Sequence, residues 1–453
     1  MNTYRTSNPH YLLMALFSCT LISVVWWWLP HPVLALVIAI IPIAIVLVLA
    51  LPFWMVLLFV IFSFYRIHEV FPALYSLKIP LMLSLASIVG LIWHIGLTQK
   101  VKLWWNRELS VITFFFVLVI LGVFMASNRG VAIDYFKGIY WKIALMTYAI
   151  TWLTRTYKDF SLASTMLTVS GVFVGLVAIS NKLNGIGLVE GTRVTIGRAL
   201  GSLLGDPNDL ALVLMFPAAF AVSLITTPQI GRWQRWLGLI SVPILFFAVI
   251  ATQSRGGLLG MMAVFGVFTY RKLNNRFLFI ALAVVAAVVL YAVAGISDRS
   301  SGGAAEEGLD ESAKGRLYAW EAAWGMALHN PFTGVGVNNF YSNYFFYSPH
   351  WDGLNHAVHS TWFGVLAETG FLGLIVFLVM IVMLLRMALS SIAQLNQMST
   401  PPAAIMASAN AVFAGLIGTV VAGTFLTQGF TWPIYILGAL ILAISRWVKV
   451  KNQ

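Results

Sequence analysis

Long apolar segments separated by short polar ones dominate the chain. A helix needs about 20 mainly apolar residues to cross a bilayer, and up to fourteen segments approach that length. They lie at residues 11–28, 33–48, 50–65, 79–97, 109–126, 138–153, 161–180, 209–227, 236–251, 256–270, 277–295, 359–387, 403–424 and 431–447. The region 33–65 can also be one broken or re-entrant helix, and a neighbouring segment can be half-inserted, so twelve crossings fit the pattern equally well. The pattern predicts an all-α, polytopic integral membrane protein with about 12–14 transmembrane helices.

Two polar stretches, 181–208 and 296–358, are too long to be simple connections between helices. The second opens with small residues and an acidic run between Ser300 and Glu311, which indicates a flexible lead. It then becomes amphipathic from Arg316 to Leu328, and its apolar positions recur at helical spacing. We expect a long helical loop that covers the membrane part. The expected division is transmembrane helices over 1–295 (with loop 181–208), a loop and cap over 296–358, and transmembrane helices over 359–453.

Composition supports lipid as the solvent. Of the 453 residues 60% are hydrophobic and 9% are charged, whereas a soluble domain has roughly 25% charged residues. Lys and Arg in short loops mark the cytoplasmic side, which places both termini inside. Twelve of the 27 Lys and Arg residues then lie on the outer side, where cations are normally scarce: Arg66, Lys78, Arg129, Lys137, Lys142, Lys182, Arg193, Arg198, Arg255, Arg299, Lys314 and Arg316. We interpret the outer side as a surface that holds negative charge.

The first candidate site is the tight outer turn Thr252–Gly257 between two predicted helices. Ser254 can cap the following helix, whose N-terminal amides add to the charge of Arg255. This combination suits an anion. The alternative is an arginine that only anchors a helix end at the membrane interface.

The second candidate is Arg198, followed by Asp206, Pro207 and Asn208 before an apolar helix. Asp206 and Pro207 predict a helix start, with a cap and a first-turn proline. Asp206 and Asn208 are then structural, and Arg198 remains for function. A solvated loop arginine is the alternative.

The third candidate is a histidine where the long loop returns to the membrane. His359 lies at the expected helix start and can accept a proton near neutral pH, whereas His356 is still in the loop. Glu368 is nine residues farther on, roughly 13 Å deeper on an ideal helix. We therefore expect Glu368 to brace neighbouring helices rather than to touch the same substrate atom.

No metal or other cofactor is expected. His350, His356 and His359 are close in sequence, but their spacing matches no zinc pattern. The lone cysteine, Cys19, offers no ligand pair. The Gly334–Gly336 segment lacks a third glycine and a flanking strand, so it indicates a turn rather than a nucleotide site. Neither nucleotide nor nucleic acid is an expected partner.

The motifs occur in an order that resembles the O-antigen ligase and polymerase superfamily of bacterial envelope glycosyltransferases. They are Arg198-x-x-Gly201 before Asp206-Pro207-Asn208, then Gln253-Ser254-Arg255-Gly256, Arg316-Leu317-x-x-Trp320, Asn330-Pro331-Phe332-x-Gly334-x-Gly336 and His359-Ser360 with Glu368-x-Gly370. Within the superfamily, Ser360 and the segments Arg66-Ile67-His68-Glu69 and Leu77-Lys78-Ile79-Pro80 resemble the ligase branch associated with exosortase systems, whereas lipopolysaccharide O-antigen ligases more often have His-Asn at residues 359–360.

The resemblance implies a glycosyltransferase of the inner membrane that acts at the periplasmic face. It would transfer a glycan from undecaprenyl diphosphate to a hydroxyl of lipid A-core or of a protein, with inversion. Arg198, Arg255 and Arg316 would hold the diphosphate and His359 would be the base, with His356, Glu368, Ser254 and Asn208 in support.

Three alternatives remain at this stage. A polymerase would differ only in its acceptor, a second lipid-linked repeat unit. A lipid-linked oligosaccharide flippase would spread its charges through a cavity reachable from both sides and would need no base. A membrane scaffold would leave the twelve outer cations unexplained.

Overall fold

The computed structural model describes residues 9–28, 32–71, 74, 76–273, 275–293 and 311–451. The predicted flexible lead at residues 300–310 lies outside them. The N-terminal half contains helices α1 (Pro9–Trp28), α2 (Pro32–Ala50), α3 (Pro52–Phe64), α4 (Ile67–Val70), α6 (Ile79–Ile92), α7 (Arg107–Phe124), α8 (Arg129–Tyr135), α9 (Trp141–Leu153) and α10 (Tyr157–Leu183). Five-residue π-helices, η1 (Trp93–Leu97) and η2 (Phe136–Tyr140), extend α6 and join α8 to α9.

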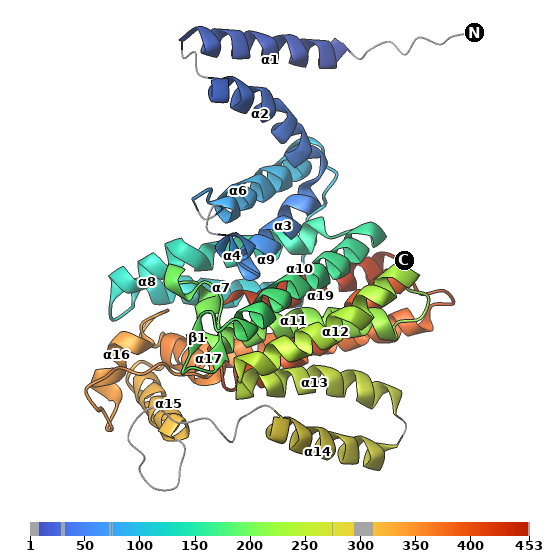
Figure 1. The fold of residues 1–453 in the computed structure, drawn as a ribbon. Coiled ribbons are helices and arrows are strands. Elements are labelled where there is room, and N and C mark those ends of the chain that lie inside the picture. The colour runs from blue at the N-terminus through green and yellow to red at the C-terminus, as the bar shows by residue number, and fades with distance from the viewer. Residues whose placement is uncertain are drawn as a thin grey trace.

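The C-terminal half contains α11 (Pro207–Thr226), α12 (Arg232–Thr252), α13 (Arg255–Lys272), α14 (Arg276–Val293), α15 (Glu311–His329), α16 (Phe340–Tyr347), α17 (Thr361–Gln397), α18 (Ala403–Gly423) and α19 (Trp432–Lys451). Between α10 and α11 lie a short antiparallel hairpin, β1 (Leu188–Val189) and β2 (Arg193–Val194), and the 3₁₀ turns η3 (Arg198–Leu200) and η4 (Leu203–Gly205). The prediction of an all-α membrane protein is confirmed (Figure 1).

Within the described chain, eight helices are long and apolar enough to cross a membrane. The count becomes nine if 40–50 and 52–64, bent by 98° against each other, form one span, as the broken-helix alternative expected. This is fewer than the 12–14 predicted. Two of the predicted spans are not counted for different reasons. Helix α9 is too short, with 13 residues, and the 18 residues of α13 include three basic ones.

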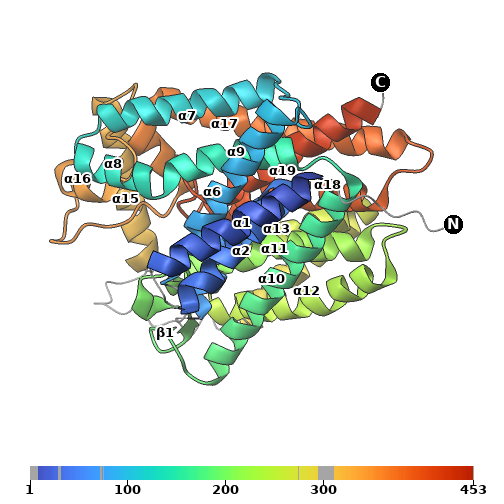
Figure 2. The ribbon, with the colours of Figure 1, turned by 90° about the horizontal axis from the view of Figure 1, so that it is seen from above.

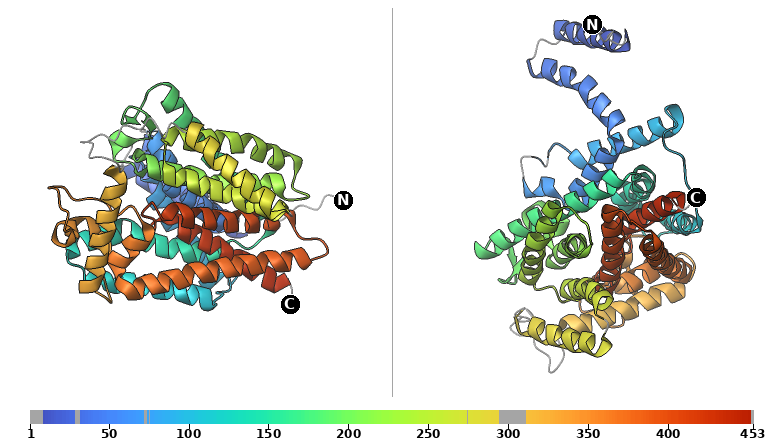
Figure 3. Two further views of the ribbon diagram at one scale, coloured as in Figure 1. Left: turned by 90° about the horizontal axis from the view of Figure 1, so that it is seen from below. Right: turned by 90° about the vertical axis from the view of Figure 1, so that its right-hand side faces the viewer.

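Helices α11, α18 and α19 lie at the centre of the bundle. In each of them 78% of the residues in the most apolar 18-residue stretch are buried. Small residues allow close packing there, as is typical between membrane helices. A Cβ added at Gly260 of α13 would come within 2.9 Å of the Gly418 carbonyl oxygen of α18. Figure 1 and the right-hand view of Figure 3 show α1 and α2 above this bundle, and Figure 2, seen from above, shows them in front of it.

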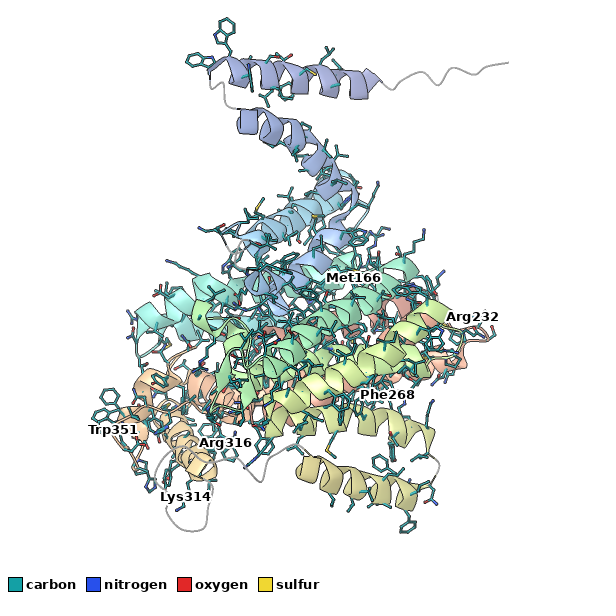
Figure 4. All side chains as sticks on the ribbon, viewed as in Figure 1. Met166, Arg232, Phe268, Lys314, Arg316 and Trp351 are labelled. Atoms are coloured by element: carbon teal, nitrogen blue, oxygen red, sulfur yellow. The ribbon has the colours of Figure 1, made fainter. Side chains whose placement is uncertain are left out.

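The bundle has two different ends. The hairpin, α8, α15 and α16 lie at one end, on the left of Figure 1, and we call this the cap end. Arg316 and Trp351 lie there, whereas Arg232 lies at the opposite end together with the end of α19 (Figure 4). The expected cap helix is present as α15, although its buried face is made of Ala319, Ala322, Ala323, Met326 and Ala327.

Candidate active site

The start of α11 organises one side of the site. Asp206 caps the helix as predicted, because its Oδ1 accepts from the amides of Asn208 (2.7 Å) and Asp209 (3.4 Å). Asn208 then uses its side chain to join two other segments. Its Oδ1 accepts from Nη2 of Arg193 (3.0 Å) and from the hydroxyl of Ser254 (2.9 Å). The side chain of Asn208 therefore ties the hairpin and the α12–α13 turn to α11.

Arg193 is a site residue that the sequence analysis counted only as an outer cation. Its side chain is 4% exposed, and its Nε donates to the carbonyl of Thr252 (3.2 Å). Glu190 lies 3.8 Å away across the hairpin. A buried guanidinium with several partners fixes local geometry strongly. The partners are up to 59 residues away in sequence, so no local pattern could have identified the role of Arg193.

The turn between α12 and α13 has the helix cap that the sequence predicted. Ser254 is fully buried and caps α13, accepting from the amide of Gly257 (3.2 Å). The preceding Gln253 has a left-handed backbone with φ of 50°, and its side chain accepts from Thr192 (2.8 Å). Arg255 is the first residue of α13 and is exposed. The charge of Arg255 is therefore added at the positive end of the α13 dipole.

Arg198 lies on the short η3 turn and is exposed. Its Nη1 donates to the carbonyl of Gly205 (3.0 Å), and a Cβ added at Gly205 would come within 2.9 Å of the Arg198 Cα. This contact closes the loop just before α11. Arg198 is not among the charges that most affect His359.

Helix α15 brings Arg316 over the bundle. The guanidinium carbon of Arg316 lies 5.9 Å from the ring centre of Phe425, which follows α18. Trp320, one turn farther on, donates from Nε1 to the carbonyl of Val358 (3.1 Å) and stacks on Phe363 at 5.0 Å. The same helix therefore fixes both Arg316 and the chain that leads to His359.

Charged groups of several segments act on His359, although the predicted Arg198 and Arg255 are not among those with the largest effect. The half-buried side chain of His359 is close enough to Arg316, Asp206, Arg193 and His356 for each of their charges to affect it. Burial comes first and the charge of Arg316 second among the causes that lower the pKa of His359 below its ordinary value. The imidazole is therefore neutral at pH 7 and able to accept a proton.

The backbone of His359 is also unusual. Its φ is 43°, in the left-handed region that residues other than glycine enter rarely, although histidine is among the more tolerant types. Such a conformation costs about 1–3 kcal/mol and persists where the surrounding structure enforces it. Ser360 directly follows and caps α17, accepting from the amide of Phe363 at 3.5 Å.

His356 lies in the loop, as expected. Its Nε2 is 2.9 Å from Oδ2 of Asp352, and its ring meets that of Tyr344 edge-on at 5.3 Å. Hydrogen bonding to His356 lowers the pKa of Asp352 below its usual range. His356 is thus held by Asp352 and Tyr344, and its charge acts on His359.

Glu368 braces neighbouring elements. Its Oε2 accepts from the amide of Asn338 (2.8 Å), and its Oε1 accepts from the amide of Phe340 at the start of α16 (3.2 Å). Two residues farther on, α17 is kinked at Gly370, whose φ is 69°. There the amide of Phe371 donates to the carbonyl of Pro331 (2.8 Å). Both contacts attach the segment after α15 to α17, so the Glu368 carboxylate is occupied by backbone amides.

The glycines of the 330–336 segment serve the same packing. A Cβ added at Gly334 would come within 2.3 Å of the Ala367 carbonyl oxygen, and one at Gly336 within 2.4 Å of the Ala126 Cβ. The segment is the turn that the sequence predicted rather than a nucleotide loop.

The Arg66–Glu69 segment packs beside the site. Arg66 forms an ion pair with the buried Glu69, and its charge also acts on Asp209 of α11. Asp209 accepts from the side chain of Gln428 at 3.2 Å. A polar interior therefore continues from the site into the bundle.

The arrangement offers no obvious metal ligand set. No group of three or more His, Cys, Asp or Glu side chains able to hold a metal occurs in the described ranges. His350, the third histidine considered, stacks on Tyr318 at 3.9 Å and lies 3.4 Å from Glu321. The chemistry available comes from cations, helix N-termini and an imidazole.

Part of the chain matches a known protein family. Residues 239–378, from α12 through the cap to α17, match a family model described as O-antigen ligase. The match includes Arg255, Arg316, His359 and Glu368. It begins after Arg193 and Asn208, which therefore lie outside it. The chain matches none of the curated proteins. The expected resemblance to the O-antigen ligase family is confirmed over residues 239–378 of this polytopic membrane protein.

Proposed function

We propose that the protein is an inverting glycosyltransferase of the bacterial inner membrane that transfers a glycan en bloc from undecaprenyl diphosphate to an acceptor hydroxyl of lipid A-core or of a protein. The cap end faces the periplasm and both termini face the cytoplasm. The observation that carries the proposal is that α15, which bears Arg316, also holds the backbone beside His359 through the bond from Trp320 to the carbonyl of Val358 (3.1 Å).

The donor would bind through its diphosphate. Arg255 at the α13 N-terminus and Arg316 on the cap are the first candidates to hold it, with Arg198 at the edge. Two unit charges 4 Å apart attract each other by about 4 kcal/mol at an intermediate effective dielectric constant. Arginines can therefore stabilise the departing diphosphate as negative charge develops on it.

His359 would act on the acceptor. Its neutral imidazole takes the proton of the acceptor hydroxyl as that oxygen attacks the anomeric carbon. The bond between this carbon and the diphosphate oxygen breaks, and undecaprenyl diphosphate leaves with the electron pair. No carboxylate is assigned as a covalent nucleophile, since Glu368 is bound to backbone amides, so a single displacement with inversion follows.

Purified protein with an undecaprenyl-diphosphate oligosaccharide tests the proposal, with lipid A-core and a second lipid-linked repeat offered separately as acceptors. We expect transfer to lipid A-core, with release of undecaprenyl diphosphate and no effect of EDTA. Chain extension on the lipid-linked repeat would instead make the protein a polymerase. Movement of the donor across a vesicle membrane that survives His359→Ala would make it a transporter.

A further inference from the structure

A second polar cavity lies at the end of the bundle remote from His359. It has a volume of about 550 Å³, within the range of roughly 300–1,000 Å³ that is usual for small-molecule sites. Its walls come from the α2–α3 elbow, η1, the α6–α7 loop and the start of α10. None of its lining residues belongs to the candidate active site.

The rim of this cavity is cationic. Lys100, Arg155 and Lys158 all line it and are exposed, whereas Asp159 is the one acid among the described lining residues. The Asp159 carboxylate is already engaged, because its Oδ2 accepts from the amides of Arg155 (2.9 Å) and Thr156 (2.7 Å) in the capping box of α10. The cavity lining therefore carries three positive side chains and one carboxylate, and that carboxylate is already hydrogen-bonded to backbone amides.

Helix ends add to this positive field. Helix α3 begins at Pro52 in the cavity wall, and its N-cap residue Leu51 makes no side-chain capping bond. In this first turn Pro52 has no amide hydrogen and the amide of Trp54 donates to the Leu51 carbonyl (3.0 Å), so the helix contributes the positive end of its dipole to the cavity wall. His94 fixes this corner, with Nε2 2.7 Å from the carbonyl of Leu49 and Nδ1 2.8 Å from the Thr98 hydroxyl.

The remaining wall is apolar. Phe53, Trp54, Leu153 and Leu162 line it below the cations. Nearby, Arg446 of α19 donates to the carbonyl of Lys102 at 3.2 Å, and Lys449 lies 5.7 Å from the Trp104 ring centre. A cationic rim above an apolar wall at a membrane surface suits an amphiphile better than a free anion.

We propose that this cavity binds one anionic phospholipid, with its phosphate among Lys100, Arg155 and Lys158 and its acyl chains along the apolar wall. The site is independent of glycan transfer. It would fasten the α2–α3 elbow to the starts of α7 and α10 on the membrane side opposite the cap.

Native mass spectrometry of the full-length protein in detergent, titrated with dioleoylphosphatidylglycerol, tests this proposal. The test variant is Lys100→Gln/Arg155→Gln/Lys158→Gln. The matched control is Arg232→Gln/Arg235→Gln/Arg276→Gln, which removes the same charge from exposed residues that lie outside the cavity lining. Dioleoylphosphatidylcholine and inorganic phosphate are the ligand controls.

We expect one tightly bound phosphatidylglycerol in the unmodified protein and in the control variant. Since each basic side chain near a surface contributes about fivefold to anionic lipid binding, the test variant should bind about 100-fold more weakly. Lys158→Gln alone should weaken binding about fivefold, which keeps the proposal testable if the triple variant fails to fold. Equal weakening by the two triple variants, equally tight phosphatidylcholine binding, or displacement of the lipid by inorganic phosphate would overturn it.

Discussion

At the scale of single residues, the account depends on His359. Its candidacy came from its place at a predicted helix start, and the structure adds an environment of specific charges, together with a left-handed backbone that no sequence pattern indicated. Two predictions follow from that environment, one about protonation and one about backbone conformation.

The first concerns the pH dependence of transfer. A base must be neutral to act, and the pKa of His359 is lowered by burial first and by Arg316 second. The acid limb of kcat/KM should therefore have its midpoint below the ordinary histidine value of about 6.5. Arg316→Gln removes a repelling charge and should move the limb to higher pH. Asp206→Asn removes an attracting charge, keeps a good helix cap, and should move it to lower pH.

The full pH profile of kcat/KM for the three proteins gives this comparison directly. Shifts in the same direction for both variants, or none in either, would mean that the limb reports another group.

The second concerns backbone strain. Glycine enters the left-handed region freely, whereas alanine pays a penalty of roughly 1–2 kcal/mol there. His359→Gly should therefore be more stable than His359→Ala by about 1 kcal/mol, while both lose transfer. Thermal unfolding in detergent measures the difference. His356 is the control position, because its φ is not positive. There the alanine variant should be at least as stable as the glycine variant. If glycine were the more stable at both positions, or alanine at both, the assignment of strain to His359 would be refuted.

At the scale of elements, most helices could be predicted, because apolar length and capping residues are local properties. Ser254 and Asp206 cap their helices as expected, and the 33–65 region is broken as one alternative had it. The hairpin at 188–194 and the role of Arg193 could not be predicted. Two-residue strands carry no periodic signal, and Arg193 depends on Asn208 and Thr252 from other elements.

Glu368 provides a prediction about how the cap is attached. Glu368→Ala leaves the buried amide of Phe340 and the part-buried amide of Asn338 without their carboxylate acceptor. This should cost about 1–3 kcal/mol for the buried amide and less for the other, whereas Glu368→Gln keeps one acceptor oxygen and should fall between. Thermal unfolding gives the order, and transfer by Glu368→Gln should persist. If Glu368→Gln were as stable as the unmodified protein but inactive, Glu368 would have to take part in the transfer reaction itself.

Gly370 provides a second prediction at this scale. Its φ is 69°, and an added Cβ would lie 2.4 Å from the Pro331 carbonyl oxygen. Gly370→Ala should destabilise the protein by about 3 kcal/mol or more, through strain and overpacking. Gly138→Ala, where nothing lies within 4 Å of the added Cβ, is the matched control for thermal unfolding. Equal stability of the two variants would mean that the kink in α17 is dispensable.

At the scale of the whole molecule, the bundle places different chemistry at its two ends. The cap end gathers the candidate active site, and the opposite end carries the cationic rim around Lys100 and Arg155. Composition predicted this polarity because basic residues in short loops sort between the two sides. The effect of the Arg193, Asp206 and Arg316 charges on His359 could not be predicted from the sequence, because helices α11 to α14 separate residue 206 from residue 316 along the chain.

Sidedness can be measured with single introduced cysteines once the one native cysteine, Cys19, is removed. In a Cys19→Ser background, Leu354→Cys at the cap end and Val450→Cys near the end of α19 introduce single exposed thiols. A membrane-impermeant maleimide applied to spheroplasts should label position 354 and label position 450 only after lysis. The reverse pattern would invert the proposed orientation.

The measurement that tests the central claim most directly is single-turnover glycan transfer by His359→Ala, with donor affinity measured in parallel. His350→Ala is the matched control, because His350 is also on the cap side but contacts only Tyr318 and Glu321 among the interactions described. A general base contributes about 10²- to 10⁴-fold, so His359→Ala should lose that much rate while donor affinity and the control stay within about threefold. Unchanged turnover in His359→Ala would contradict the account.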